Sequence, residues 1–122
     1  MFDHVGFRVR TLEASRKFYL AALAPLGFGV AMEGNFGVGL GQDGKPELWL
    51  SPGDPAASPL HIAFAARNRA EVDAFHAAAL AAGGKDNGAP GLRPHYHPNY
   101  YGAFAIDPDG HNIEAVCHSA GP

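Results

Sequence analysis

Two histidines and two glutamates stand at positions where they could bind one metal ion together: His4, Glu47, His61 and Glu114. Neutral imidazole is a good ligand for zinc, nickel, cobalt or iron, and carboxylates add the negative charge that holds a dication. Four such ligands in an octahedral shell leave two positions for water or for a substrate that binds through two oxygens. Taken singly, a histidine or glutamate in such a position is more often a surface or capped side chain than a ligand. Whether these four residues form one site therefore depends on the strands that position them.

The chain contains an internal repeat, which is the first feature to establish because it determines the fold. Residues 3–27 align with residues 60–84 at an offset of 57. The informative identities, which alanine-rich helices do not produce by chance, are His4/His61, Phe7/Phe64 and Gly27/Gly84. The two histidines therefore occupy equivalent positions in two copies of one unit.

Each copy has the pattern of one strand, one helix and three further strands. Alternating apolar residues predict the opening strands around 5–9 and 62–66, and apolar residues at helical spacing predict helices near 12–23 and 69–82. Glycine and proline punctuation predicts the remaining strands near 28–33, 36–41, 46–51, 85–89, 100–106 and 112–118. With 54–59 as the linker, we expect one α+β domain over 1–122, made of two βαβββ modules at about 1–53 and 60–118.

Strand parity predicts which way the candidate ligands point. Successive side chains on a strand face opposite sides of the sheet, and the apolar set of each strand packs against the helix. His4 and His61 alternate with that apolar set, and so do Glu47 and Glu114 on the last strand of each module. Each module therefore supplies one histidine and one glutamate to the sheet face that the helices leave uncovered.

Several segments of the chain resemble those of the vicinal oxygen chelate superfamily, the glyoxalase/bleomycin resistance protein/dioxygenase group. DHVGFRV with RKFYLAALAPLGF is similar to the family's first strand and helix, LHIAFAA to its histidine strand, and DPDGHNIEAV to its closing turn and glutamate strand. The resemblance implies paired modules that form a curved mixed β-sheet cleft, commonly in a homodimer. It also implies a divalent transition metal (Zn, Ni, Co, Fe or Mn) at the centre of the cleft.

Carried over residue by residue, the resemblance implies that His4, His61 and Glu114 are the ligands shared across much of the superfamily. Glu47, in PELWL, matches the fourth ligand of glyoxalase I-like members. In those members the metal binds neighbouring substrate oxygens, and a ligand glutamate, here Glu114 or Glu47, moves a proton between adjacent carbons. The implied activity is that of a metal-dependent lyase or isomerase acting on a small vicinal-oxygen substrate, such as one derived from a 2-oxoaldehyde.

The segment 93–101 (RPHYHPNYY) is a candidate substrate-binding loop. Two histidines separated by one residue suggest metal binding, but packing of a proline-flanked aromatic loop over the cleft mouth is the favoured interpretation. The candidate substrate contacts from both modules are Arg8, Trp49, His95, His97 and Tyr101.

Two other functions stay open. A ligand-binding or drug-sequestering protein of the bleomycin-resistance type would use the cleft without chemistry, with Trp49 and Tyr101 stacking on a planar ligand. A ring-cleaving dioxygenase would hold iron with His4, His61 and Glu114 and leave a coordination position open. The pairing of modules is open too: exchange between two chains would bring His4 and Glu47 of one chain against His61 and Glu114 of the other.

The composition narrows the functional class further. Apolar residues make up 47% and charged residues 17% of the chain, which is typical of a globular domain. A net charge of −3 with scattered basic residues gives no basic patch for nucleic acid, and no apolar run reaches membrane-spanning length. With a single cysteine and no export signal, we expect a cytoplasmic protein. Cys117 is expected to be buried, and His111 and His118 to be solvated.

Overall fold

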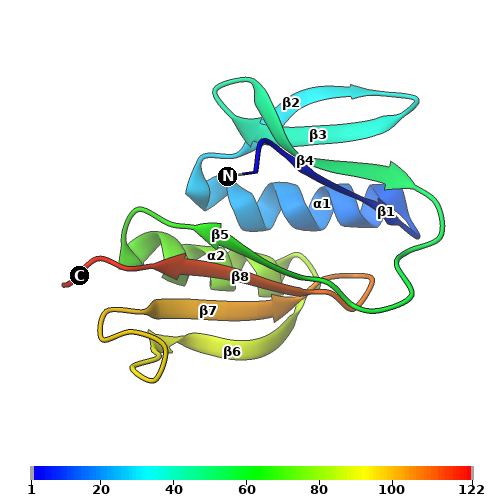
Figure 1. Cartoon of the computed structure of the whole chain (residues 1–122). Helices are drawn as coiled ribbons and strands as arrows, with labels where there is room; N and C mark the ends of the chain where they lie inside the picture. Colours follow the sequence, from blue (N-terminus) through cyan, green and yellow to red (C-terminus); the bar gives the residue numbers. More distant parts are fainter. Residues whose placement is uncertain (1, 122) are drawn as a thin grey trace.

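A computed structural model describes residues 2–121, and it shows two consecutive βαβββ modules (Figure 1). The elements of the first module are β1 (Val5–Val9), α1 (Leu12–Leu23), the short 3₁₀ helix η1 (Ala24–Leu26), β2 (Gly29–Gly34), β3 (Gly37–Gln42) and β4 (Lys45–Pro52). Those of the second are β5 (His61–Ala65), α2 (Arg69–Ala81), β6 (Lys85–Leu92), β7 (Tyr101–Ile106) and β8 (Asn112–Cys117). The predicted order of elements and the α+β class are confirmed.

The two modules have the same sheet topology. The first sheet has the order β1-β4-β3-β2 and the second β5-β8-β7-β6. In each sheet the opening strand pairs in parallel with the last strand of its module, and the other neighbours are antiparallel. The opening strand of each module, β1 or β5, is therefore an edge strand; His61 is the first residue of β5, and His4 directly precedes β1.

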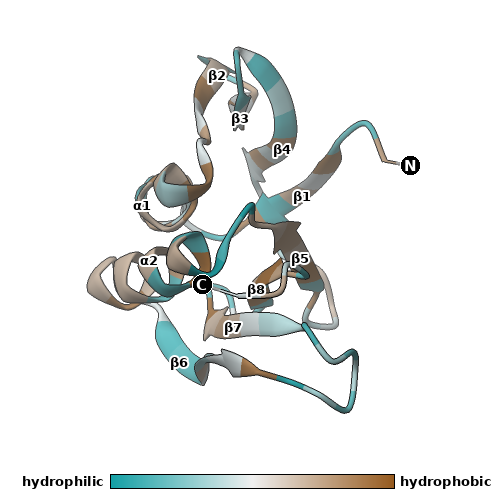
Figure 2. Ribbon diagram, turned by 90° about the vertical axis from the view of Figure 1, so that its left-hand side faces the viewer, coloured by the Kyte–Doolittle hydropathy of each residue, from teal (hydrophilic) through white to brown (hydrophobic). Residues whose placement is uncertain are grey.

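The helices cover one side of both sheets. Figure 2 shows α1 and α2 lying side by side, with the sheets together on the other side of the pair. Phe18 and Leu23 of α1 and Val72 and Phe75 of α2 are fully buried in this layer. Burying a side chain of this size contributes about 1.5–3 kcal/mol, so the layer between helices and sheets fixes which strand faces stay open. No helix among residues 2–121 is both long enough and apolar enough to cross a membrane.

The turn before β8 ties the second module to the first. Asp107 is buried and accepts a hydrogen bond of 2.5 Å from the hydroxyl of Tyr19 on α1. Desolvation raises the pKa of the Tyr19 hydroxyl, and the charge of Asp107 raises it further, so Tyr19 stays a donor. Arg10 adds a second link, because its backbone N–H donates to Asp109 at 3.0 Å.

His111, in the same turn, is only 1% exposed, so the expectation that it is solvated is wrong. Its Nδ1 accepts a hydrogen bond of 2.9 Å from the backbone N–H of Leu60, and its ring packs edge-on against Phe7. Burial here comes from the first module, which the local sequence of a turn does not reveal. His118 is exposed and Cys117 is buried, as predicted.

Candidate metal and substrate site

His61 and Glu114, which we call the second half-site, lie together on the open face of the second sheet. On the parallel strands β5 and β8, His61 is level with Asn112, and Glu114 is level with Ala63. The Nε2 atom of His61 lies 3.1 Å from one carboxylate oxygen of Glu114. The other carboxylate oxygen accepts a hydrogen bond from the hydroxyl of Tyr100. Glu114 is only 1% exposed, so this carboxylate relies on its protein partners.

Both ring nitrogens of His61 face oxygen atoms. Nδ1 lies 3.1 Å from the backbone carbonyl of Asn112, to which it can only donate. A neutral imidazole has one N–H and one lone pair, so Nε2 then directs its lone pair at the carboxylate of Glu114. Such a contact is stable only with a proton or a cation between the two groups.

The chemistry and spacing of His61 and Glu114 fit two ligands of one metal ion. Nitrogen and oxygen atoms each about 2.1 Å from the same cation, at right angles, lie about 3 Å apart. That is close to the 3.1 Å between Nε2 and the nearer oxygen of Glu114. The carbonyl of Asn112 orients the ring through the opposite nitrogen, as outer partners of ligating histidines commonly do.

An aromatic-walled pocket of about 460 Å³ opens beside this pair. It is lined by His61, Tyr96, Tyr100, Phe104, Asn112 and Glu114. Burial and the hydrogen bond to Glu114 raise the pKa of Tyr100 to about 12, so its hydroxyl keeps its proton at neutral pH. The pocket therefore combines a buried carboxylate and an imidazole with apolar walls, which suits a small ligand carrying a few polar atoms.

Arg93 shapes the loop that brings Tyr96 and Tyr100 to the pocket. Its guanidinium donates to the carbonyls of Gly91 and Ala89, each at 2.8 Å, and lies 5.4 Å from the centre of the Phe104 ring. Its backbone N–H also donates to the carbonyl of Tyr100 at 2.7 Å. The loop is thus closed by its own hydrogen bonds and does not depend on a ligand for its shape.

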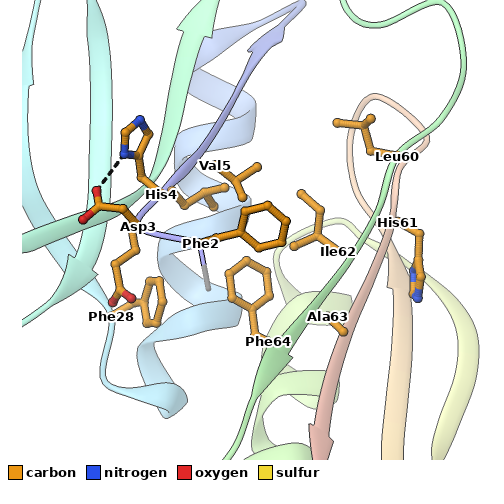
Figure 3. Close-up of a pocket in the computed structure, with 12 residues that line it drawn as sticks. Phe2, Asp3, His4, Val5, Phe28, Leu60, His61, Ile62, Ala63 and Phe64 are labelled. Atoms are coloured by element: carbon orange, nitrogen blue, oxygen red, sulfur yellow. Dashed lines mark hydrogen bonds and ion pairs between the residues drawn. The ribbon is translucent and has the colours of Figure 1, made fainter.

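His4 and Glu47, the first half-site, do not join this pair within one chain. The side chain of His4 is 56% exposed, and its Nδ1 lies 2.8 Å from a carboxylate oxygen of Asp3. That hydrogen bond, together with Lys45, holds the pKa of Asp3 below its usual value. Figure 3 shows His4 and His61 on opposite sides of an apolar groove of about 490 Å³ between the modules. Within residues 2–121, no three histidine, cysteine or carboxylate side chains gather closely enough to hold a metal ion.

The two glutamates are not at equivalent positions of the repeat. Gly6 pairs with Trp49 in the first sheet, and the corresponding Ala63 pairs with Glu114 in the second. Trp49 is therefore the counterpart of Glu114, and Glu47 is the counterpart of Asn112. The expectation that each module has its glutamate at the same position is therefore wrong, because Glu47 lies two residues before the counterpart of Glu114. A shift of two residues along a strand leaves the side chain on the same face of the sheet.

Trp49 lies across the open face of the first sheet. Its ring contacts the edge of Phe36, with 5.6 Å between ring centres. A Cβ atom on Gly39 would lie 2.9 Å from a carbon of the Trp49 ring, so the glycine provides the room in which the indole sits. Arg8 is exposed on the same face, and its stem passes over Gly53.

In the 93–101 segment, Tyr96 and Tyr100 line the pocket, whereas Tyr101, the tyrosine expected to contact substrate, points to the other side of the sheet. The hydroxyl of Tyr101 donates to Asp73 of α2 at 2.6 Å, on the helix side of the sheet. The ring of His95 lies against that of Tyr96, tilted by 46°, with 4.2 Å between ring centres, and Nδ1 of His97 accepts from the backbone N–H of Asn99. Tyr100, which the sequence reasoning missed, is the residue that reaches Glu114. Parity could have identified it, because Tyr100 alternates with Tyr101.

Known proteins similar to this chain include several solved structures. The family model described as "Glyoxalase/Bleomycin resistance protein/Dioxygenase superfamily" matches residues 1–115. A glyoxalase/bleomycin resistance protein from Albidiferax ferrireducens T118 is 33% identical with a TM-score of 0.83, over 98% of this chain and 99% of that one. A family enzyme from Burkholderia phytofirmans PsJN is 20% identical, with a TM-score of 0.74, and covers 96% of this chain and 98% of its own.

One further solved structure carries a more specific name. The oxidase ChaP-H1 is 21% identical with a TM-score of 0.69, over 100% of this chain and 98% of that one. At this identity the likeness is one of fold alone. No curated protein matches the chain.

Proposed function

The chain belongs to the glyoxalase/bleomycin resistance protein/dioxygenase superfamily, and from this we propose that it is a metal-dependent enzyme acting on a small molecule with two neighbouring oxygen atoms. The leading reaction is a glyoxalase-like lyase or isomerase step. The observation that carries the proposal is the contact of 3.1 Å between Nε2 of His61 and the buried carboxylate of Glu114. Zn, Ni, Co, Fe and Mn all suit such a set of nitrogen and oxygen ligands.

We place the complete site between two copies of the chain. His61 and Glu114 of one chain would face His4 of the other, with Glu47 beside that histidine. In support, His4 points away from the second half-site of its own chain, and its Nε2 has no hydrogen-bond partner within residues 2–121. A symmetric dimer repeats each contact on both chains, so two such sites would form.

When bound, the cation would polarise both substrate oxygens and so acidify the carbon between or beside them. Moving the proton then needs a carboxylate that is free to accept it. Both oxygens of Glu114 are engaged, one by His61 and one by Tyr100. Glu47 is half-buried and makes no hydrogen bond or ion pair with residues 2–121, which favours it as the base. The aromatic walls around His61 would exclude water from the reacting atoms.

Mixing two variants tests the site and its assembly together. His4→Ala and Glu114→Gln should each lose metal binding when studied alone. If the site forms between chains, refolding the two variants together restores one intact site in each mixed dimer, or about a quarter of all sites. Metal bound per chain, measured after dialysis, gives this fraction. Full binding by either variant alone would remove the proposed ligands, and no recovery in the mixture would remove the shared site.

A second candidate is a ring-cleaving dioxygenase, and the position of Trp49 favours it. With tryptophan at the counterpart of Glu114, the assembled site has two histidines and one glutamate, the ligand set of non-haem iron(II) oxygenases. Oxygen uptake with catechol and ferrous protein would support this reaction. Conversion of the hemithioacetal of methylglyoxal and glutathione, without oxygen uptake, would support the lyase. Metal-free protein that binds a planar aromatic ligand would instead support a binding module.

A further inference from the structure

We propose that Tyr100 is a positioning residue that holds one oxygen of Glu114 and so leaves the other oxygen, beside Nε2 of His61, as the single carboxylate ligand atom for a cation. The inference rests on the proposed function, because it assigns a role within the same site. It goes beyond that function by stating how the carboxylate binds and which side chain decides it.

The carboxylate of Glu114 has two oxygens with two different partners. One accepts the hydroxyl proton of Tyr100, and the other lies 3.1 Å from Nε2 of His61. Because Glu114 is 1% exposed, the oxygen that Tyr100 occupies has no ready replacement in solvent. A carboxylate held in this way cannot turn to offer both oxygens to one ion.

The ring of Tyr100 is fixed independently of Glu114. The edges of Tyr96 and His118 meet it, with ring centres at 5.0 and 5.2 Å. Its backbone N–H donates to the carbonyl of His97 at 3.0 Å. The hydroxyl of Tyr100 is therefore positioned by contacts besides the one with Glu114.

Gly102 provides an independent sign that space is kept for this hydrogen bond. A Cβ atom at this position would lie 3.3 Å from the bonded oxygen of Glu114 and 3.3 Å from a ring carbon of Tyr100. A Cβ atom at position 102 would be tight enough that the ring or the carboxylate must shift by a few tenths of an ångström. The glycine at position 102 is therefore part of the arrangement that lets the hydroxyl of Tyr100 reach Glu114.

The neighbouring tyrosine is a matched control. Tyr101 also donates its hydroxyl to a carboxylate, that of Asp73, at 2.6 Å, but it does so on the helix side of the sheet. Tyr100→Phe and Tyr101→Phe thus remove the same atom from adjacent residues. Only Tyr100→Phe removes a hydrogen bond to Glu114.

The test is calorimetric titration of the full-length, metal-free protein with Co²⁺, together with the visible absorption spectrum of the bound ion. Loss of an outer partner of a metal ligand weakens binding by about 10–100-fold, and we expect Tyr100→Phe to fall in this range. We also expect a changed Co²⁺ spectrum, because the freed carboxylate can offer both oxygens. Tyr101→Phe should stay within about twofold of the unmodified protein. His61→Ala, which removes a ligand, is the reference for a lost site.

Three results would overturn the inference. Unchanged affinity and spectrum in Tyr100→Phe, with binding lost in His61→Ala, would reject the role of Tyr100 and leave the proposed function standing. Unchanged affinity in His61→Ala as well would reject both. If Tyr100→Phe does not fold, Gly102→Val decides, since it keeps the hydroxyl but adds a branched side chain where even a Cβ atom is already tight against the ring and the carboxylate; wild-type affinity and spectrum in that variant would reject the inference.

Discussion

The two half-sites come from one repeated unit, yet only the second is assembled within a chain. Both lie at the start of an edge strand and on the parallel strand beside it, in sheets of identical order. In the second, His61 meets a carboxylate that is 1% exposed and that Tyr100 also holds. In the first, the side chain of His4 is about as exposed as that of His61 (56% against 52%), but it turns to its sequence neighbour Asp3. The shared topology therefore fixes the backbone position of each candidate ligand, while the neighbouring residues determine whether its side chain is held in place.

The difference makes the halves complementary. The second carries the buried negative charge that a dication needs, whereas the first offers an exposed imidazole and an indole, Trp49, at the counterpart of Glu114. As long as no cation is bound, a site built from two second halves would bring two uncompensated buried carboxylates together, and one built from two first halves would have none buried. Pairing unlike halves avoids both costs.

The largest expected effect separates the two glutamates. Glu114→Gln should weaken metal binding by more than about 100-fold, because it removes a ligand together with its charge, whereas outer partners account for about 10–100-fold. Glu47→Gln should weaken binding by less than about tenfold and should mainly lower turnover, because its proposed role is to move a proton. Competition with a chelator gives the affinities. Equal losses of metal affinity in the two variants would mean that both glutamates act as ligands of the same importance.

Breaking the hydrogen bond between the modules measures how much this link contributes to the stability of the chain. Tyr19→Phe removes a buried hydrogen bond to the Asp107 carboxylate and should cost about 1.5–3 kcal/mol of unfolding free energy. Since folding raises the pKa of Tyr19, its contribution is present below the unfolded value of about 10 and is lost as pH rises above it. Denaturant unfolding at pH 8 and pH 11 measures both effects. A variant that loses as much stability between these pH values as the unmodified protein would contradict the assignment.

Making the first half-site resemble the second should change metal affinity by a smaller amount and should strengthen binding. Trp49→Glu places a carboxylate at the counterpart of Glu114, where it can act as a fourth ligand in the assembled dimer. A charge-assisted contact of this kind would tighten metal binding by about tenfold. Trp49→Gln is the control, since it removes the indole without adding charge. If both variants bind the metal with unchanged affinity, the position of Trp49 does not face the cation.

The same comparison explains what the sequence could predict. Local periodicity was sufficient for the strands and helices, and parity correctly placed His61 and Glu114 on one face. Parity cannot distinguish Glu47 from Trp49, because a shift of two residues restores the same face. The register between β1 and β4, which places Trp49 beside Gly6, distinguishes them, and this pairing joins segments that are distant in the sequence. Contacts between distant segments, such as that of Tyr100 with Glu114, depend on the conformation of the 93–101 loop, which sequence periodicity does not predict.

The smallest effect is expected at the contact between Asp3 and His4, the one side-chain hydrogen bond that His4 makes among residues 2–121. Asp3→Asn removes the charged acceptor that orients His4 and that Lys45 also contacts at 3.2 Å. Asp3 is itself exposed, and pairs of this kind contribute little and are screened by salt, so metal affinity should fall by less than about fivefold. The loss should shrink further between 50 mM and 500 mM salt, whereas the loss in Tyr100→Phe, at a buried carboxylate, should not. A loss from Asp3→Asn as large as that from Tyr100→Phe, and insensitive to salt, would mean that the dimer buries the first half-site as deeply as the chain buries the second.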